Sequence, residues 1–285
     1  MTTAPIASHR PTGWHGQLHL SFDTDDTGRT YLAHRHARAP YKIQRPFYPE
    51  DGVCHGVMLH TAGGIVGGDR LSTTVDLAPH THALLTTAAA NKLYGSAGET
   101  ATQSVTLNLG AGAWLEWLPQ ELIVFQGGRL HQTIRVELGD QALWLGWEIT
   151  RFGRTARQET FTEGEWRSHT EVWQQGKPLW IDPQWLPASA DLLTSPHGLA
   201  GYPVVGSFAI LGRSPEADQL ERARSLWAEL NQPGDAGVTQ LQSGYLCRYR
   251  GPSSGAARRW FTQVWQDVRQ TWGDRPPCRP RVWPR

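Results

Sequence analysis

The chain has 285 residues and a mass of 31.8 kDa, and its 27 Lys and Arg residues nearly balance its 26 Asp and Glu residues. This balance argues against a nucleic-acid-binding protein, because neutralising phosphates needs a surplus of basic side chains on one face. No apolar run approaches the roughly 18 residues of a membrane span, and the N-terminus lacks a signal-peptide pattern. The three cysteines (Cys54, Cys247, Cys278) are too scattered for a disulfide framework. The sequence therefore predicts a cytoplasmic protein without membrane segments.

Residues 1–12 are predicted to form a flexible N-terminal tail, and residues 13–274 a single β-rich domain. Between residues 14 and 210, short β-rich stretches alternate with glycine-containing turns about every 8–15 residues, without interleaved helices. This pattern predicts a mainly β fold of many short, mostly antiparallel strands. The clearest stretches are Val57–His60, Leu71–Leu77, Leu84–Thr87, Ser104–Leu109, Leu122–Phe125, Thr133–Leu138 and Leu143–Ile149.

Two helices are predicted late in the chain, near residues 215–231 and 255–272. Ser214 is a suitable N-cap for the first helix, and both segments carry apolar residues at helical spacing. The second helix is so apolar that it must lie against the sheet or a partner. The Pro-rich residues 275–285 are predicted to form a C-terminal tail.

A glycine cluster, Gly63-Gly64-Ile65-Val66-Gly67-Gly68-Asp69-Arg70, invites comparison with a phosphate-binding loop. Such a loop needs Gly-Lys-Ser/Thr at the start of a helix, whereas a strand-like alternation follows here. We therefore interpret the cluster as a tight connection between strands that uses positive φ at some glycines.

Two histidine pairs at spacing i, i+2 are candidate metal ligands, His34 with His36 and His80 with His82. On a strand each pair would share one face. A transition-metal site needs further ligands that converge on the ion, and the sequence does not show such convergence. These four residues are therefore weak candidates.

Two carboxylates, Glu116 and Glu148, stand within apolar strands. A buried, unpaired carboxylate costs on the order of several kcal/mol, so each needs a cation, strong hydrogen bonds or a wet cavity. Arg151, Arg154 and Arg157 are nearby candidates for a structural ion pair. A catalytic acid pair and a polar conduit for a cation are the alternatives.

Fourteen tryptophans are an unusual number for this length, and six of them lie between Trp144 and Trp185. They could stack on carbohydrate. Each buries roughly 150–250 Å², however, and a monomer rarely exposes more than a few hundred Å² of contiguous apolar surface. Most of the tryptophans are therefore predicted to lie in the core or in a subunit interface.

Seven segments occur in the order found in one family, and together they resemble the UreD (also called UreH) urease accessory proteins. They are Leu59-His-Thr-Ala-Gly-Gly-Ile-Val-Gly-Gly-Asp-Arg-Leu71, Leu84-Leu-Thr-Thr-Ala-Ala-Ala-Asn-Lys-Leu-Tyr94, Leu115-Glu-Trp-Leu-Pro-Gln-Glu-Leu-Ile-Val-Phe125, Leu145-Gly-Trp-Glu148, Gly153-Arg-Thr-Ala-Arg157 with Glu159, Gly201-Tyr-Pro-Val-Val-Gly206 and Cys278-Arg-Pro-Arg-Val-Trp283.

The resemblance implies a non-catalytic protein of urease maturation, mostly β with two helices. Members of the family join UreF and the GTPase UreG in a complex that docks on apo-urease. Nickel then enters the dinuclear centre of urease, driven by GTP hydrolysis on UreG. A water-filled internal tunnel is thought to carry the nickel, so the resemblance implies no permanent cofactor but a transient passage of nickel.

Carried over residue by residue, the resemblance suggests a set of oxygen-bearing side chains along this path, because spaced oxygen ligands hold a hydrated dication weakly. The candidates are Asp69, Thr86, Thr87, Glu116, Glu121, Glu148 and Glu159, with Arg70, Lys92 and Arg154 as their charge partners. We hypothesise that Glu116 and Glu148 face a common polar interior. The chain departs from the family pattern at Gln126 (commonly aspartate), Gln158 (usually glycine) and Asn91 (commonly threonine).

Two other functions are open at this point. A carbohydrate-active protein would use the Trp144–Trp185 region with a pair such as Glu116 and Glu148, whose carboxylates should then lie about 5–10 Å apart in an open cleft. A plain dimerisation scaffold would carry no cation. Apolar strands and Trp-rich helices also predict poor solubility of the chain without UreF.

Overall fold

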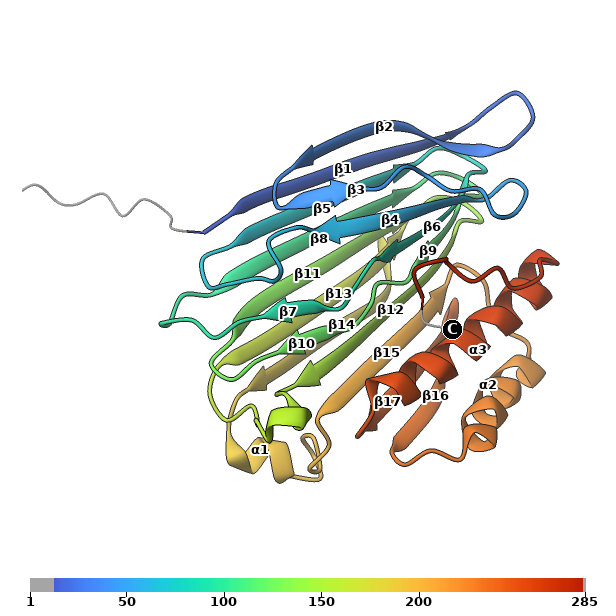
Figure 1. The fold of residues 1–285 in the computed structure, drawn as a ribbon. Helices are drawn as coiled ribbons and strands as arrows, with labels where there is room; N and C mark the ends of the chain where they lie inside the picture. Colours follow the sequence, from blue (N-terminus) through green and yellow to red (C-terminus); the bar gives the residue numbers. More distant parts are fainter. Residues whose placement is uncertain (1–12, 284–285) are drawn as a thin grey trace, which may run out of the picture.

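Two β-sheets packed face to face form the body of the protein, in a computed structural model that describes residues 13–283 (Figure 1). The predicted tail at residues 1–12 lies outside the described residues. Sheet A has seven strands, in the spatial order β14 (Lys177–Pro187), β13 (Glu165–Gln174), β11 (Arg129–Leu138), β8 (Ala101–Leu109), β5 (Arg70–Leu77), β1 (His15–Thr24) and β2 (Thr30–Arg38).

Sheet B has ten strands, eight of them in one continuous row. The row runs β16 (Asp235–Leu241), β17 (Gly244–Gly251), β15 (Val204–Leu211), β12 (Leu143–Phe152), β9 (Trp114–Trp117), β6 (His82–Thr87), β4 (Cys54–His60) and β3 (Tyr41–Ile43), while β10 (Leu122–Val124) joins β12 to β7 (Asn91–Leu93). All seven stretches singled out in the sequence are strands, and the predicted mainly β class is confirmed.

The prediction of mostly antiparallel strands is wrong, because most of the strand pairs are parallel. From β4 to β13 the chain crosses repeatedly between the sheets, and neighbours within each sheet, such as β5 with β8 and β6 with β9, run in the same direction. Antiparallel pairs occur mainly at the ends, for example β1 with β2 and β16 with β17. The regular turns thus join strands of opposite sheets instead of closing hairpins.

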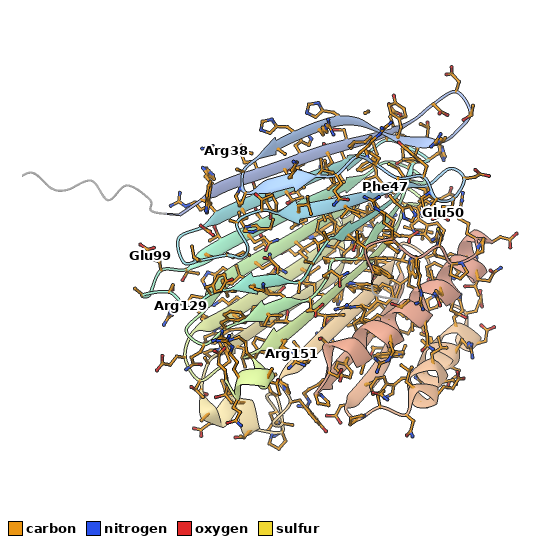
Figure 2. The ribbon with its side chains drawn as sticks, in the orientation of Figure 1. Arg38, Phe47, Glu50, Glu99, Arg129 and Arg151 are labelled. Atoms are coloured by element: carbon orange, nitrogen blue, oxygen red, sulfur yellow. The ribbon has the colours of Figure 1, made fainter. Side chains whose placement is uncertain are left out.

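The main hydrophobic core lies between the two sheets, and side chains fill this space (Figure 2). Strand β5 shows how the sequence builds it: Leu71, Thr73, Val75 and Leu77 alternate with more accessible residues and are buried. Each fully buried aliphatic side chain contributes roughly 1.5–3 kcal/mol. The period of two therefore assigns one face of the strand to the core.

Helices α2 (Ala217–Leu230) and α3 (Ser254–Gly273) cover the outer face of sheet B, where a second core forms (Figure 1). Both helices were predicted, but α2 begins after Glu216, whose capping box with Gln219 replaces the expected Ser214 cap. The short helix α1 (Ala190–Thr194) and the hairpin of β16 and β17, after residue 210, were not predicted.

Residues 275–283 do not form the predicted C-terminal tail. Trp283 is 8% exposed, and its ring packs against Trp147 of β12 and Trp265 of α3. Its burial outweighs the Pro-rich composition that suggested a tail. Trp283 therefore anchors the segment to the core on the helix side of sheet B.

The glycine cluster connects β4 to β5, as predicted. Gly63 and Gly68 have φ of 78° and 86°, a conformation that glycine adopts without steric cost. Asp69 closes the loop, since its carboxylate accepts hydrogen bonds from Trp14 N (2.7 Å) and Val66 N (3.0 Å).

The tryptophans are mostly interior, as predicted. Eight of the fourteen are buried, and among the described residues the two well-exposed ones are Trp14 (51%) and Trp185 (62%). Their main role is therefore packing.

Candidate functional site

A pocket of about 250 Å³ lies between the two sheets. Sheet A contributes Gln103 and Gln132, and sheet B contributes Glu148 and Thr150. The segment 88–92, which follows β6, completes the wall together with Thr87. Amide, hydroxyl and carboxylate groups thus interrupt the apolar core at this position.

Among the described residues, Glu148 is the one acidic residue that lines this pocket. Its carboxylate accepts hydrogen bonds from Ser168 Oγ (3.1 Å), Thr170 Oγ1 (3.2 Å) and the Gln132 amide, all from sheet A. None of the ion pairs within residues 13–283 includes Glu148, so Arg151, Arg154 and Arg157 are not its partners. Burial, which these hydrogen bonds only partly offset, raises the pKa of Glu148 to about 7.

His60 also lines the pocket, and the sequence analysis did not select it. Neither ring nitrogen has a hydrogen-bond partner within residues 13–283, and burial lowers the pKa of the imidazole. A neutral imidazole can coordinate a transition-metal ion. Its place next to the glycine cluster, in Leu59-His60-Thr61, was the available signal.

Glu116 and Glu148 lie on opposite faces of sheet B, so the hypothesis of a common interior is wrong. The register of β9 and β12 pairs Glu116 with Leu145, three residues before Glu148. Because side chains alternate along a strand, positions 145 and 148 point to opposite faces. Glu116 faces the helices, and Glu148 faces sheet A.

Glu116 belongs to a buried network of charges between sheet B and α3. It is 0% exposed, accepts a hydrogen bond from His82 Nε2 (2.6 Å) and lies 3.6 Å from Arg269 Nε. Burial lowers the pKa of His82, which stays neutral and donates the bond. Burial alone would raise the pKa of Glu116, but the bond from His82 and the charge of Arg269 outweigh it and lower this pKa.

The network extends from Arg269 to the segment before β4. Arg269 Nη2 donates to Glu50 Oε2 (2.5 Å), and His55 Nε2 lies 2.7 Å from Glu50 Oε1. The Glu–Arg pairing expected for Glu116 therefore exists, but its partner is Arg269 of α3 instead of an arginine near residue 154.

Three of the predicted site residues, Thr87, Lys92 and Glu148, meet at the pocket, and the others lie elsewhere. Thr86 faces the helices and donates to Leu118 O, while Glu121 pairs with Arg258 of α3. Asp69 holds the glycine loop, Arg70 is exposed, and Glu159 pairs with Arg154 as expected.

Among residues 13–283, neither histidine pair belongs to a group of three metal-ligating residues with close ligand atoms. His80 lies in an exposed turn with φ of 61°, whereas His82 is buried. His34 and His36 are exposed on β2. In the described part of the chain, the group of three metal-ligating residues with close ligand atoms is Glu50, His55 and Cys278.

The three positions that depart from the family pattern lie in different surroundings. Gln126 does not line the pocket; its amide bonds to Thr162, so an acid is not missing from the wall. Gln158 has φ of 55°, the left-handed conformation in which glycine is favoured. Asn91 lines the pocket beside Lys92.

The carbohydrate-active alternative loses its proposed carboxylate pair, since Glu116 and Glu148 are on opposite sides of a sheet. Trp144, Trp147 and Trp166 are buried, so they offer no stacking platform.

No helix within residues 13–283 combines the length and the apolar character that a membrane span requires.

Comparison with known proteins places this chain among the urease accessory proteins. The profile of the family described as "UreD urease accessory protein" matches residues 15–284, and the chain belongs to this UreD family. It is 55% identical to urease accessory protein UreD of Acaryochloris marina over 271 residues, which are 95% of each chain. It is 56% identical to urease accessory protein UreD of Nostoc sp., a match that covers 95% of this chain and 96% of the relative. It is 40% identical to urease accessory protein UreD of Janthinobacterium sp., a match that covers 94% of this chain and 90% of the relative.

Proposed function

We propose that this chain acts in urease maturation as a non-catalytic, cytoplasmic scaffold that joins UreF and the GTPase UreG on apo-urease. In this proposal nickel is a transient cargo that passes through the pocket between the sheets. The family membership supports the role in urease maturation, and the resemblance described above supports the partners and the cargo.

The observation that carries the proposed relay is Glu148, a carboxylate that lines an interior pocket without a cationic partner. A resident salt bridge would neutralise the group, whereas an unpaired carboxylate can accept a passing dication. Because its pKa is about 7, Glu148 is partly protonated at neutral pH and would hold a hydrated nickel ion weakly. Thr87, Gln132 and the neutral His60 offer further donor atoms around the same pocket.

The test is reconstitution of urease from apo-urease, UreF, UreG, GTP, bicarbonate and limiting nickel, with and without this chain. Ammonia release only when the chain is present supports the scaffold role. Equal activity without it, together with no co-purification with UreF, would overturn that role.

A second arm separates nickel passage from scaffolding. Glu148→Gln should slow activation at limiting nickel, with recovery when nickel is in excess, while the variant still co-purifies with UreF. Glu121→Gln is the matched control, because it removes a carboxylate that pairs with Arg258 away from the pocket. Full activation by Glu148→Gln at limiting nickel would contradict the relay and favour a scaffold that carries no cation.

A further inference from the structure

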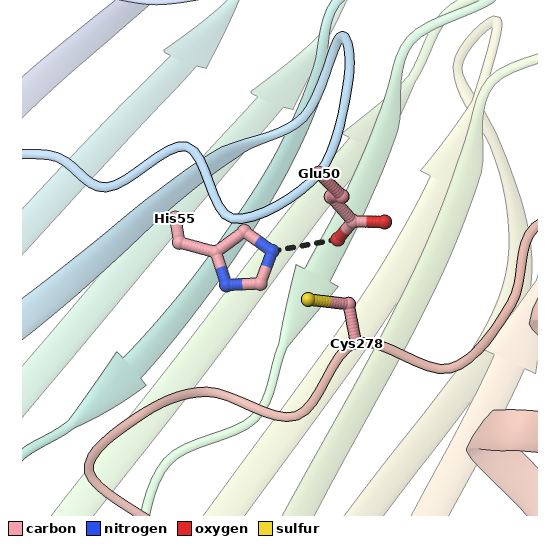
Figure 3. A group of neighbouring side chains, drawn as sticks. All are labelled: Glu50, His55 and Cys278. Atoms are coloured by element: carbon pink, nitrogen blue, oxygen red, sulfur yellow. Dashed lines mark hydrogen bonds and ion pairs between the residues drawn. The ribbon is translucent and has the colours of Figure 1, made fainter.

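Three side chains from separate segments direct ligand atoms at one another beside the buried charge network. Glu50 precedes β4, His55 lies on β4, and Cys278 follows α3. One ligand atom of each lies within 4.8 Å of the others. Figure 3 shows the Cys278 sulfur directed toward the His55 ring, close to the Glu50 carboxylate.

We propose that Glu50, His55 and Cys278 form a binding site for one divalent transition-metal ion of the zinc, nickel and cobalt class. The donor set is one carboxylate oxygen, one imidazole nitrogen and one sulfur. Thiolate and imidazole select these ions over Mg²⁺ and Ca²⁺, which prefer all-oxygen sites. Three protein ligands leave a fourth position for water, the arrangement of an accessible rather than a closed structural site.

The surroundings prepare Glu50 for this role. Arg269 donates to Oε2, which fixes the carboxylate and leaves Oε1 directed at His55 Nε2 (Figure 3). Such an outer partner typically strengthens metal binding 10–100-fold. Burial would raise the pKa of Glu50, but the bonds from His55 and Arg269 lower it to about 2, so the carboxylate is ionised.

Binding displaces protons in a defined way. The ion replaces the Cys278 thiol proton, which leaves to solvent; burial raises the pKa of this thiol, so it is protonated beforehand. The His55 proton must reside on Nδ1, so that Nε2 can bind the metal. The 2.7 Å separation of Nε2 and Glu50 Oε1 then widens, because the metal takes the place of the bridging proton.

The local charges accommodate a dication. Once Cys278 is a thiolate, it joins Glu50 and Glu116 around the single buried guanidinium of Arg269. The resulting two excess negative charges balance the charge of the ion. Arg275, which donates to Asp51 O, lies on the partly exposed side, where solvent screens it. His55 is buried and the other two ligands are partly exposed, so an ion can enter.

The experiment adds Co²⁺ alone to the full chain and records the thiolate-to-cobalt charge-transfer band. We expect one cobalt ion to bind per chain and to give this band. Zn²⁺ or Ni²⁺ should displace the cobalt, and the band should be lost in Cys278→Ser. His55→Gln should weaken Zn²⁺ binding by at least about 10-fold, since even the loss of an outer partner has this effect. Zn²⁺ should also raise the melting temperature of the wild type but not of Cys278→Ser.

Two matched controls address other ligands. The double substitution His34→Gln and His36→Gln removes two exposed histidines. Cys247→Ala removes a thiol that is buried in the helix-side core. Both variants should leave the band unchanged. A band that persists in Cys278→Ser, or its absence from the wild type, overturns the site. The site does not depend on the proposed relay, because metal binding is measured without UreF, UreG or urease.

Discussion

Trp283, two residues from the end of the chain, donates its indole N–H to Thr86 Oγ1 of β6 at 3.0 Å. Thr86 in turn donates to Leu118 O. The hydrogen bond joins the second of the seven family segments to the last one, between residues 197 positions apart. Thr86 is thus a structural anchor for the C-terminal segment, whereas its neighbour Thr87 lines the pocket.

Trp283→Ala should destabilise the protein by about 3–5 kcal/mol, because it empties a buried ring site between Trp147 and Trp265. Chemical unfolding measures the change. Trp185→Ala, at a ring that is 62% exposed, is the control and should cost far less. Equal effects of the two substitutions would mean that residues 275–283 do not pack in solution as described.

Glu148→Gln should stabilise the protein at pH 8 by about 1–3 kcal/mol and have little effect at pH 5. The folded-state pKa of Glu148 is raised to about 7 from an ordinary value of 4.5, so the folded chain binds the proton more tightly than the unfolded chain. The stability of the wild type therefore falls as pH rises from 4.5 through 7 and changes no further above that range. Because glutamine does not ionise, the variant avoids this loss of stability with rising pH.

The measurement for Glu148→Gln is thermal or urea unfolding at both pH values. Glu229→Gln, at an exposed pair with Arg222, is the control and should not alter the pH dependence. The raised pKa would be refuted by a variant whose stability relative to wild type is the same at pH 5 and pH 8.

Glu116→Gln should destabilise the protein by about 3 kcal/mol at neutral pH. His82 and Trp265 contact different carboxylate oxygens of Glu116, and glutamine offers an oxygen to only one of them. The substitution also leaves the buried guanidinium of Arg269 with Glu50 alone. Breaking a buried ion pair typically costs about 3–5 kcal/mol. Because Glu50 still pairs with Arg269, we expect a loss at the lower end of this range. Urea unfolding gives the value. Glu221→Gln, in an exposed pair with Arg224, should cost less than about 1 kcal/mol.

Gly146→Ala should destabilise the protein by about 1–3 kcal/mol, because the new Cβ would meet the Trp144 ring at 2.0 Å. The ring lies across the glycine inside the main core, so it must shift toward sheet A. Differential scanning calorimetry compares this variant with Gly237→Ala on β16, whose Cβ would meet nothing within 4 Å. A melting temperature unchanged in Gly146→Ala would show that the core there is loosely packed.

The sequence allowed prediction of the strands and long helices because their signals are local. The alternation in Leu71–Leu77 marks one buried face, and the apolar stripe of residues 255–272 marks the helix α3. The pairing of strands was not predictable in this way. A turn such as Gly110-Ala111-Gly112 can close a hairpin or carry the chain to the opposite sheet, and here it joins β8 of sheet A to β9 of sheet B.

For the candidate site, some residues were predictable from the sequence but their partners were not. The in-strand carboxylates Glu116 and Glu148 were recognisable from sequence, because a charge in an apolar strand must be satisfied. Their partners were not, since His82, Arg269 and Ser168 approach from other strands or from α3. His60 was missed because its one local signal, a place next to the glycine cluster, does not show that the side chain faces a pocket.

The sequence by itself determined the mainly β class, the positions of the long helices and the resemblance to the UreD family, because these depend on local periodicity and on the order of short motifs. Only the tertiary structure decided that most strands run parallel, that Glu116 and Glu148 face opposite sides of sheet B, and that Cys278 meets Glu50 and His55. These relationships join residues far apart in the chain, and they are fixed by how two sheets and a helix pack together, which no local pattern specifies.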